Sequence, residues 1–172
     1  LQVLRYRSAR CLLLVQILKF CCICTVFTVD SNCLCIALQE NLCYFLQEVS
    51  PVAEECGVKL AIHPDDPPVP ILGLPRIVSS MEDFNYILNK VNIPANGVCF
   101  CTGSLGASPK NDLPAMVKEI GERIHFIHLR NVKKDEEGNF FEANHLDGDN
   151  DMFAIMKELL LVQQKKRTPI PF

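Results

Sequence analysis

Three short apolar segments, each followed by a polar loop, most strongly constrain what this chain can fold into. Residues 58–62, 97–101 and 124–128 are apolar on both faces and are predicted to be strands. Helices are predicted between them over residues 81–90 and 113–122, with short connections. This alternation favours a parallel sheet covered by helices, which is an α/β fold.

Helices are also predicted on either side of this alternating region. The first begins near Glu40 and ends at Gly57, and its apolar stripe is Leu42, Phe45, Leu46 and Val49. The second covers about residues 151–164, and its stripe is Met152, Ile155, Met156, Leu159 and Leu160. Between them a polar loop is predicted after Asn131, followed by a short strand over 139–143.

The number of repeating units indicates part of a barrel. Three βα units and a fragment are visible, about half of an eight-fold barrel that takes roughly 250 residues. A doubly wound sheet is the alternative. It would be expected to carry a glycine-rich first turn such as G-x-G-x-x-G, which this sequence lacks.

A side chain that can bind a metal lies at the carboxyl end of each predicted strand. These residues are His63, Cys101 and His128, and they are about one βα unit apart. Because barrel active sites lie at this end of the strands, the three side chains are expected to converge. Two imidazoles and a thiolate suit Mn²⁺, Fe²⁺, Co²⁺ or Zn²⁺ better than Mg²⁺ or Ca²⁺. His125 is expected on the same face of its strand, either beside a ligand or as a structural residue.

Charge and composition exclude one class of partner. The chain has 17 Lys and Arg against 20 Asp and Glu, so no excess of positive charge favours a nucleic acid. About 49% of the residues are apolar, which is enough for a packed core.

Residues 1–37 have a different character from residues 38–172. Six of the ten cysteines lie in the first 35 positions, and the first residue is Leu rather than Met. Residues 11–29 form an apolar run preceded by three arginines, the pattern of a membrane anchor. A buried segment, or a stretch that does not belong to the fold, would give the same pattern. We therefore treat 1–37 and 38–172 as separate units.

Several motifs within residues 38–172 resemble mannonate dehydratase, a lyase of hexuronate (glucuronate) catabolism. They are HPDDPP at 63–68, ILGLPRIV at 71–78, NG at 96–97, CTGSLG at 101–106, NDLP at 111–114, HLRN at 128–131, HLDGD at 145–149 and DM at 151–152. Their order and spacing match the family, and the resemblance does not cover residues 1–37.

The resemblance implies a xylose-isomerase-like TIM barrel that uses Mn²⁺ or Fe²⁺. Such an enzyme, a carbon–oxygen hydro-lyase, converts D-mannonate to 2-keto-3-deoxy-D-gluconate and water. By motif, His63, Cys101 and His128 would be metal ligands. Arg130 is a candidate for the substrate carboxylate, because its planar fork suits that group, and a salt bridge is the alternative. Further candidates for substrate binding or loop ordering are Asp65, Asp66, Asn131 and His145.

The family's fourth ligand and its catalytic His lie in an Arg-Pro-Asp-His-Gly motif, and a Tyr lies further on. That motif does not occur in this sequence, and residues 168–172 resemble the strand that leads into it. The resemblance therefore places the acid/base His and Tyr beyond Phe172. We expect a cytoplasmic barrel fragment that acts on a sugar acid but is inactive alone. Its association with further copies is left open.

Two rival functions remain. One is a non-catalytic remnant of the same barrel, tethered to a membrane by residues 11–29. The other is a sugar isomerase or epimerase. Cys101 argues against this second rival, because such sites are generally rich in carboxylates.

Overall fold

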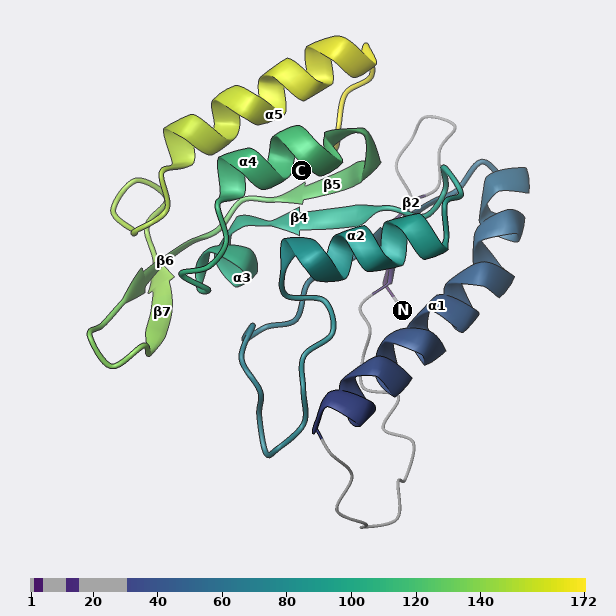
Figure 1. Ribbon diagram of the computed structural model, residues 1–172. Coiled ribbons are helices and arrows are strands. Elements are labelled where there is room, and N and C mark those ends of the chain that lie inside the picture. The colour runs from purple at the N-terminus through teal and green to yellow at the C-terminus, as the bar shows by residue number, and fades with distance from the viewer. Residues whose placement is uncertain (1, 5–11, 16–30) are drawn as a thin grey trace.

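A computed structural model describes residues 2–4, 12–15 and 31–172 of the chain (Figure 1). It begins with strands β1 (Gln2–Leu4) and β2 (Leu12–Val15). The other strands are β3 (Lys59–Ile62), β4 (Val98–Cys101), β5 (Ile124–His128), β6 (Asn131–Lys134) and β7 (Phe140–Ala143). The helices are α1 (Ser31–Glu55), α2 (Met81–Lys90), α3 (Thr102–Gly106), α4 (Leu113–Ile120) and α5 (Met152–Lys166), and a 3₁₀ turn covers Gly121–Arg123.

The main sheet has the order β1-β2-β3-β4-β5, and strands β2 to β5 run parallel. Each strand pairs with the next one along the chain, as in a barrel, whereas a doubly wound sheet reverses its strand order partway. β1 is antiparallel to β2 at one edge. At the other edge, the Ile127 N–H donates to the Pro171 carbonyl 2.9 Å away. The segment predicted to be the next strand therefore begins to line β5.

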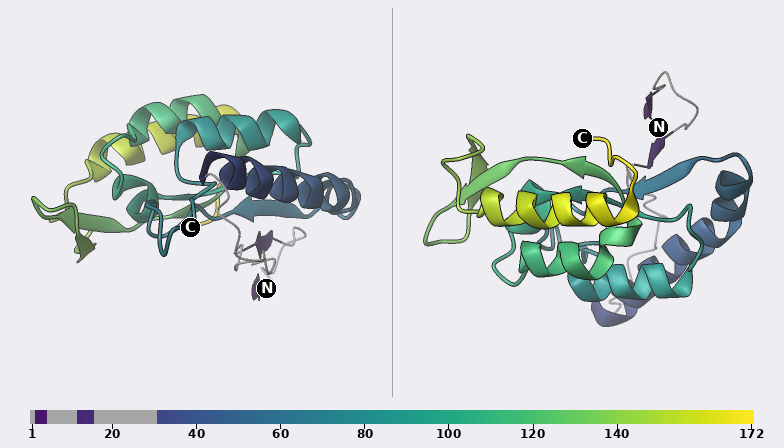
Figure 2. Two further views of the ribbon diagram at one scale, coloured as in Figure 1. Left: turned by 60° about the horizontal axis from the view of Figure 1, so that its bottom comes forward. Right: turned by 90° about the horizontal axis from the view of Figure 1, so that it is seen from above.

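The helices gather on one face of this sheet, as the left view of Figure 2 shows. Leu60 and Ile62 of β3 and Phe100 of β4 are buried in a core cluster that also contains Phe84 of α2 and Val117 of α4. Burying an apolar side chain of this size contributes about 1.5–3 kcal/mol, so these residues help to hold the helices against the sheet. One covered face is the arrangement of a barrel wall.

Local capping explains why the predicted helices form where they do. Ser80 and Asp83 make a capping box at the start of α2. Asp112 and Asp151 accept backbone N–H groups at the starts of α4 and α5. Gly57 follows α1 with φ of +65°, a conformation that favours glycine. These signals act within a few residues, and the sequence prediction of α2, α4 and α5 is confirmed.

Four local expectations were wrong. β6 lies where a polar loop was predicted, and it pairs antiparallel with β7. α3 follows β4 directly and was not predicted. Phe45 and Leu160 were placed on buried stripes but are 47% and 52% exposed, because the cores of α1 and α5 are centred on neighbouring residues. Cys43 is buried on α1 instead of Phe45.

Helix α1 runs without a break across the expected boundary between residues 37 and 38. The proposed anchor at residues 11–29 lies outside the described residues except for β2. Among the helices of the described part of the chain, none combines the length and the hydrophobicity that a membrane span requires.

Candidate metal centre

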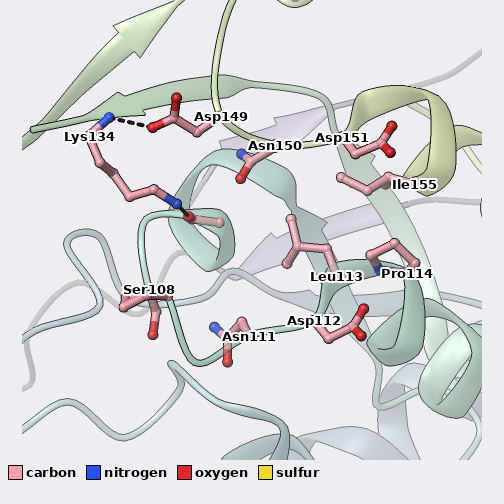
Figure 3. A pocket seen from close by; sticks show the side chains of 12 residues that line it. Ser108, Asn111, Asp112, Leu113, Pro114, Lys134, Asp149, Asn150, Asp151 and Ile155 are labelled. Atoms are coloured by element: carbon pink, nitrogen blue, oxygen red, sulfur yellow. Dashed lines mark hydrogen bonds between the residues drawn. The ribbon is translucent and has the colours of Figure 1, made fainter.

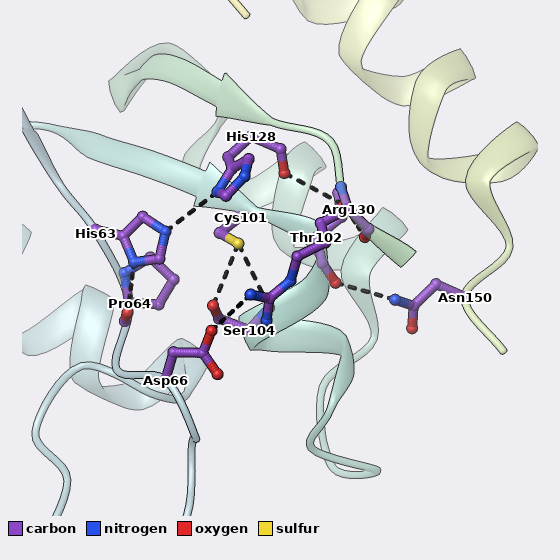
Figure 4. Close-up of polar contacts among 9 residues, drawn as sticks. All are labelled: His63, Pro64, Asp66, Cys101, Thr102, Ser104, His128, Arg130 and Asn150. Carbon is purple, nitrogen blue, oxygen red and sulfur yellow. Dashed lines mark hydrogen bonds and ion pairs between the residues drawn. The ribbon is translucent and has the colours of Figure 1, made fainter. Parts of the chain in front are cut away.

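The ligand atoms of His63, Cys101 and His128 all lie within 4.8 Å of one another (Figure 4). His63 directly follows β3, and the other two residues end β4 and β5. Cys101 and His128 are partners in the register of those two strands, so the sheet itself sets their separation. The predicted convergence of the three side chains is confirmed, and their role as ligands stays a prediction.

The orientation of the His63 ring is fixed by its own backbone neighbour. Its Nδ1 lies 2.7 Å from the Pro64 carbonyl oxygen. Because a carbonyl can only accept, Nδ1 carries a proton, so in the neutral ring Nε2 is the nitrogen with the lone pair. Nε2 lies 3.3 Å from Nδ1 of His128, facing the cluster. Hydrogen bonding of the second ring nitrogen to a carbonyl is the usual way proteins orient a metal-binding imidazole.

The sulfur of Cys101 is buried, but its surroundings favour the negatively charged thiolate. Burial alone would raise the pKa of the thiol. Hydrogen bonds from His128, His63 and Ser104 outweigh burial and lower this pKa to about 5. Burial alone would lower the pKa of His63, but contacts with the sulfur outweigh it and raise that pKa. The cluster therefore favours positive charge at its centre, which a divalent cation supplies.

Cys99, on the same strand, shows that burial in β4 does not by itself lower the pKa of a thiol. It is 1% exposed and lies two residues before Cys101 on β4. Burial, with a smaller contribution from the Cys101 charge, raises its pKa to about 12. Cys99 is thus a neutral thiol, and it makes a matched control for Cys101.

Arg130 lies beside the cluster and is held from several sides. Its Nη1 lies 2.7 Å from Oδ2 of Asp66. Its backbone N–H donates to the Thr102 hydroxyl at 2.8 Å, and that hydroxyl donates to the Arg130 carbonyl at 2.6 Å. A Cβ added to Gly103 would meet the Arg130 Nε at 2.1 Å, so the guanidinium needs a glycine beneath it. Both alternatives foreseen for Arg130 stay open, since the Asp66 ion pair leaves other guanidinium donors free for a carboxylate.

The other predicted substrate residues order loops in this structure. Asp65 accepts the backbone N–H groups of residues 77 and 78, both at 2.9 Å. Asn131 is buried and its side chain bonds the backbone of residues 132, 145 and 150. His145 is exposed, with Nε2 3.2 Å from the Leu129 carbonyl. Their role in substrate binding stays a prediction.

The acid/base His and Tyr are expected beyond Phe172. Phe172 itself carries no group that could transfer a proton. Its apolar ring is exposed and is not among the side chains of the His63, Cys101 and His128 cluster. The preceding residue, Pro171, accepts the N–H of Ile127 on β5. This contact fits the expectation that residues 168–172 lead into a further strand. The positions of the catalytic His and Tyr beyond Phe172 stay a prediction.

His125 does not join the cluster. It lies at the register shift between β4 and β5, three residues before His128. Its Nδ1 donates to the Leu60 carbonyl at 2.7 Å, and burial lowers its pKa to about 4. A Cβ on Gly97 would lie 2.3 Å from this ring, so His125 packs directly against β4. Its position fits the structural role rather than the role beside a ligand.

Two cavities lie away from the cluster and are not lined by its residues. One, of about 200 Å³, lies between the loops before α4 and α5 (Figure 3). Lys134 lines it and donates to the Gly106 carbonyl at 2.8 Å. The other, of about 530 Å³, lies between residues 68–70 and the starts of α2 and α4.

A divalent transition metal fits the cluster better than Mg²⁺ or Ca²⁺ would. The donor set would be one thiolate and two imidazoles, which leaves room in the coordination sphere for the expected fourth ligand. Sequence reasoning found these three residues but missed the hydroxyls of Thr102 and Ser104. The CTGS stretch gave no signal for them, because their bonds depend on α3 and on the pairing of β4 with β5.

Comparison with known proteins identifies relatives of this chain. The model of the family described as D-mannonate dehydratase (UxuA) matches residues 23–170. A mannonate dehydratase of Rhizobium meliloti (strain 1021) is 53% identical over 133 residues, which cover 76% of this chain and 33% of the relative. Mannonate dehydratase 2 of Agrobacterium fabrum is 51% identical over 139 residues, or 78% of this chain and 35% of the relative.

Solved structures show the same fold. A mannonate dehydratase from Streptococcus suis serotype 2 superposes with a TM-score of 0.73 and 39% identity, over 84% of this chain and 40% of that one. A xylose isomerase domain protein from Planctomyces limnophilus superposes with a TM-score of 0.57 and 16% identity, over 72% of this chain and 41% of that one. The expectation of a partial TIM barrel of the xylose-isomerase type is confirmed.

The matches cover most of this chain but only part of each relative. The chain spans about one third of the length of the curated relatives it matches. The family match starts at residue 23, ahead of the boundary expected at residue 38, and that boundary stays a prediction. Since the family match covers most of the chain, and relatives about half identical to it carry the same name, the chain belongs to the D-mannonate dehydratase family.

Proposed function

We propose that this chain carries the metal-binding part of an enzyme that dehydrates D-mannonate to 2-keto-3-deoxy-D-gluconate in hexuronate catabolism. The observation that carries the proposal is the convergence of His63, Cys101 and His128 to within 4.8 Å. The names of the relatives supply the substrate. Mn²⁺ or Fe²⁺ is the proposed metal, because the donor set suits both ions.

The reaction removes a weakly acidic proton next to a carboxylate and expels a hydroxyl group from the neighbouring carbon. A bound cation would supply stabilisation of the negative charge that develops on the carboxylate side. Within this chain, the Cys101 thiolate and the two imidazoles hold the cation. The guanidinium of Arg130 binds and orients the substrate carboxylate, and Asp66 holds that guanidinium in place. The proton-transferring His and Tyr are expected outside this sequence, so we expect no turnover by the chain alone.

A chimera tests the catalytic proposal. The segment of the Rhizobium meliloti enzyme that this chain matches is replaced by the corresponding residues of this chain, and D-mannonate consumption is measured with Mn²⁺. Cys101→Ser should abolish turnover and lower metal affinity at least about a hundredfold. This loss exceeds the one that is typical when a residue that only touches a ligand is replaced. Cys99→Ser should leave both nearly unchanged, because that thiol is neutral and has no polar partner among the described side chains.

Two results would overturn parts of the proposal. Equal losses in Cys101→Ser and Cys99→Ser would show that burial of sulfur, and not metal binding, matters. Turnover by the purified 172-residue chain with Mn²⁺ would contradict the expectation that it is inactive alone.

A further inference from the structure

The Cys101 sulfur occupies a junction between two elements. β4 passes directly into α3, and the sulfur accepts the backbone N–H of Ser104 at 3.4 Å in the first turn of that helix. This contact alone is an ordinary helix cap and needs no metal.

The Ser104 hydroxyl adds a second bond to the same sulfur. Its Oγ lies 3.2 Å from the Cys101 Sγ, and the Ser104 side chain is fully buried (Figure 4). Most buried hydroxyls have an acceptor, and serine in a helix usually finds a backbone carbonyl one turn back. Among the described residues, the Cys101 sulfur is the acceptor that Ser104 uses instead. The hydroxyl and the backbone N–H of Ser104 therefore both point at one sulfur atom.

Ser50 of α1 is a second buried serine with which Ser104 can be compared. Ser50 is equally buried, and its hydroxyl has no hydrogen-bond partner within the part of the chain that is described. A buried hydroxyl can thus be tolerated in this fold without a role at the metal centre. Ser50 therefore provides a matched control for Ser104.

The two donors that Ser104 supplies restrict how the Cys101 sulfur can face a metal. They occupy lone pairs on the side of α3 and leave the side toward His63 and His128 for a cation. They also withdraw electron density from the sulfur, which lowers its tendency to give an electron to a bound metal. Groups that touch a ligand in this way tune both affinity and electronic properties of metal sites.

We propose that Ser104 is a positioning residue of the metal centre: its hydroxyl directs the Cys101 sulfur toward the two imidazoles and weakens electron donation to the metal. The proposal rests on the proposed function, because it requires a metal on Cys101. The role belongs to the hydroxyl, since the backbone N–H remains in any substitution at this position.

Cobalt(II) provides the test, because thiolate-bound Co²⁺ has a near-ultraviolet charge-transfer band. The chain and its Ser104→Ala and Ser50→Ala variants are titrated with Co²⁺ while absorbance is recorded. On binding, the Cys101 sulfur gives a lone pair to Co²⁺ and a Co–S bond forms. Any proton still held by the sulfur or by an imidazole nitrogen that binds passes to the buffer. We expect Ser104→Ala to shift the band to longer wavelength, because the sulfur then donates more readily, and to weaken binding about tenfold. Ser50→Ala should keep the band and affinity of the unsubstituted chain.

The possible outcomes are separable. If the unsubstituted chain shows the band, and Ser104→Ala changes neither the band nor the affinity for Co²⁺, the inference about Ser104 is overturned. The proposed metal centre is then unaffected. No charge-transfer band in the unsubstituted chain overturns the metal assignment of the proposed function, and this inference with it. If circular dichroism shows that Ser104→Ala is unfolded, the spectrum of Ser104→Thr decides. That variant keeps a hydroxyl, so an unshifted band supports the inference and a shifted one overturns it.

Discussion

Asp66 and Arg130 form a 2.7 Å ion pair that joins the loop after β3 to the segment after β5. Burial alone would lower the pKa of Arg130, but Asp66 and the Cys101 charge outweigh burial and raise it. Arg130 therefore stays positive beside the His63, Cys101 and His128 cluster (Figure 4). The pair fixes the position of the guanidinium, and recognition of the substrate carboxylate by Arg130 stays a prediction.

Arg130→Lys in the chimera should raise the KM for D-mannonate and lower kcat/KM about 10- to 100-fold. Lysine keeps the charge but loses the planar fork, and one hydrogen bond to a charged group is worth about 1.5–3 kcal/mol. Steady-state kinetics with Mn²⁺ would measure the change. Arg167→Lys, at an exposed residue after α5, is the control and should behave like the parent. If kcat/KM does not change in Arg130→Lys, the carboxylate is bound elsewhere.

Thr102→Val should destabilise the chain by about 1–3 kcal/mol at nearly constant volume. The Thr102 hydroxyl accepts the Arg130 N–H and donates to the Arg130 carbonyl, and valine leaves that N–H without its partner. Urea denaturation followed by circular dichroism gives the difference in free energy of unfolding. Thr168→Val removes an exposed hydroxyl and should change stability by less than about 0.5 kcal/mol. An equal response in both variants would contradict the role of Thr102.

His125 should make the chain less stable in mild acid. Burial lowers its pKa from 6.5 to about 4, so between these values the unfolded chain binds a proton that the folded chain does not. The stability that comes from neutral His125 is complete above pH 6.5 and is lost as the pH falls toward 4. At about pH 5 the loss from this group is about 2 kcal/mol relative to about pH 7.

His125→Gln can still donate to the Leu60 carbonyl but does not titrate, so it should remove this part of the pH dependence. The free energy of unfolding from urea curves at the two pH values gives the measurement. His145→Gln, at an exposed imidazole, should retain the parent's dependence. The same acid sensitivity in His125→Gln and in the parent would show that other groups cause it.

The sequence by itself determined the elements whose signals are local. Capping by Ser80, Asp112 and Asp151 placed three helices, and the apolar run at 124–128 placed β5. Because parallel strands present their carboxyl ends together, strand ends also predicted that His63, Cys101 and His128 converge. The resemblance of short motifs then predicted the family.

Only the tertiary structure decided which partners these residues take. β6 forms from a polar segment because β7 supplies its hydrogen bonds, and no periodicity within the segment announces that pairing. The Asp66–Arg130 ion pair links residues on different strand ends, and His125 turns to Leu60 because of a register shift. Such contacts depend on the relative positions of segments far apart in the chain. Local propensity acts over a few residues and carries no information about them.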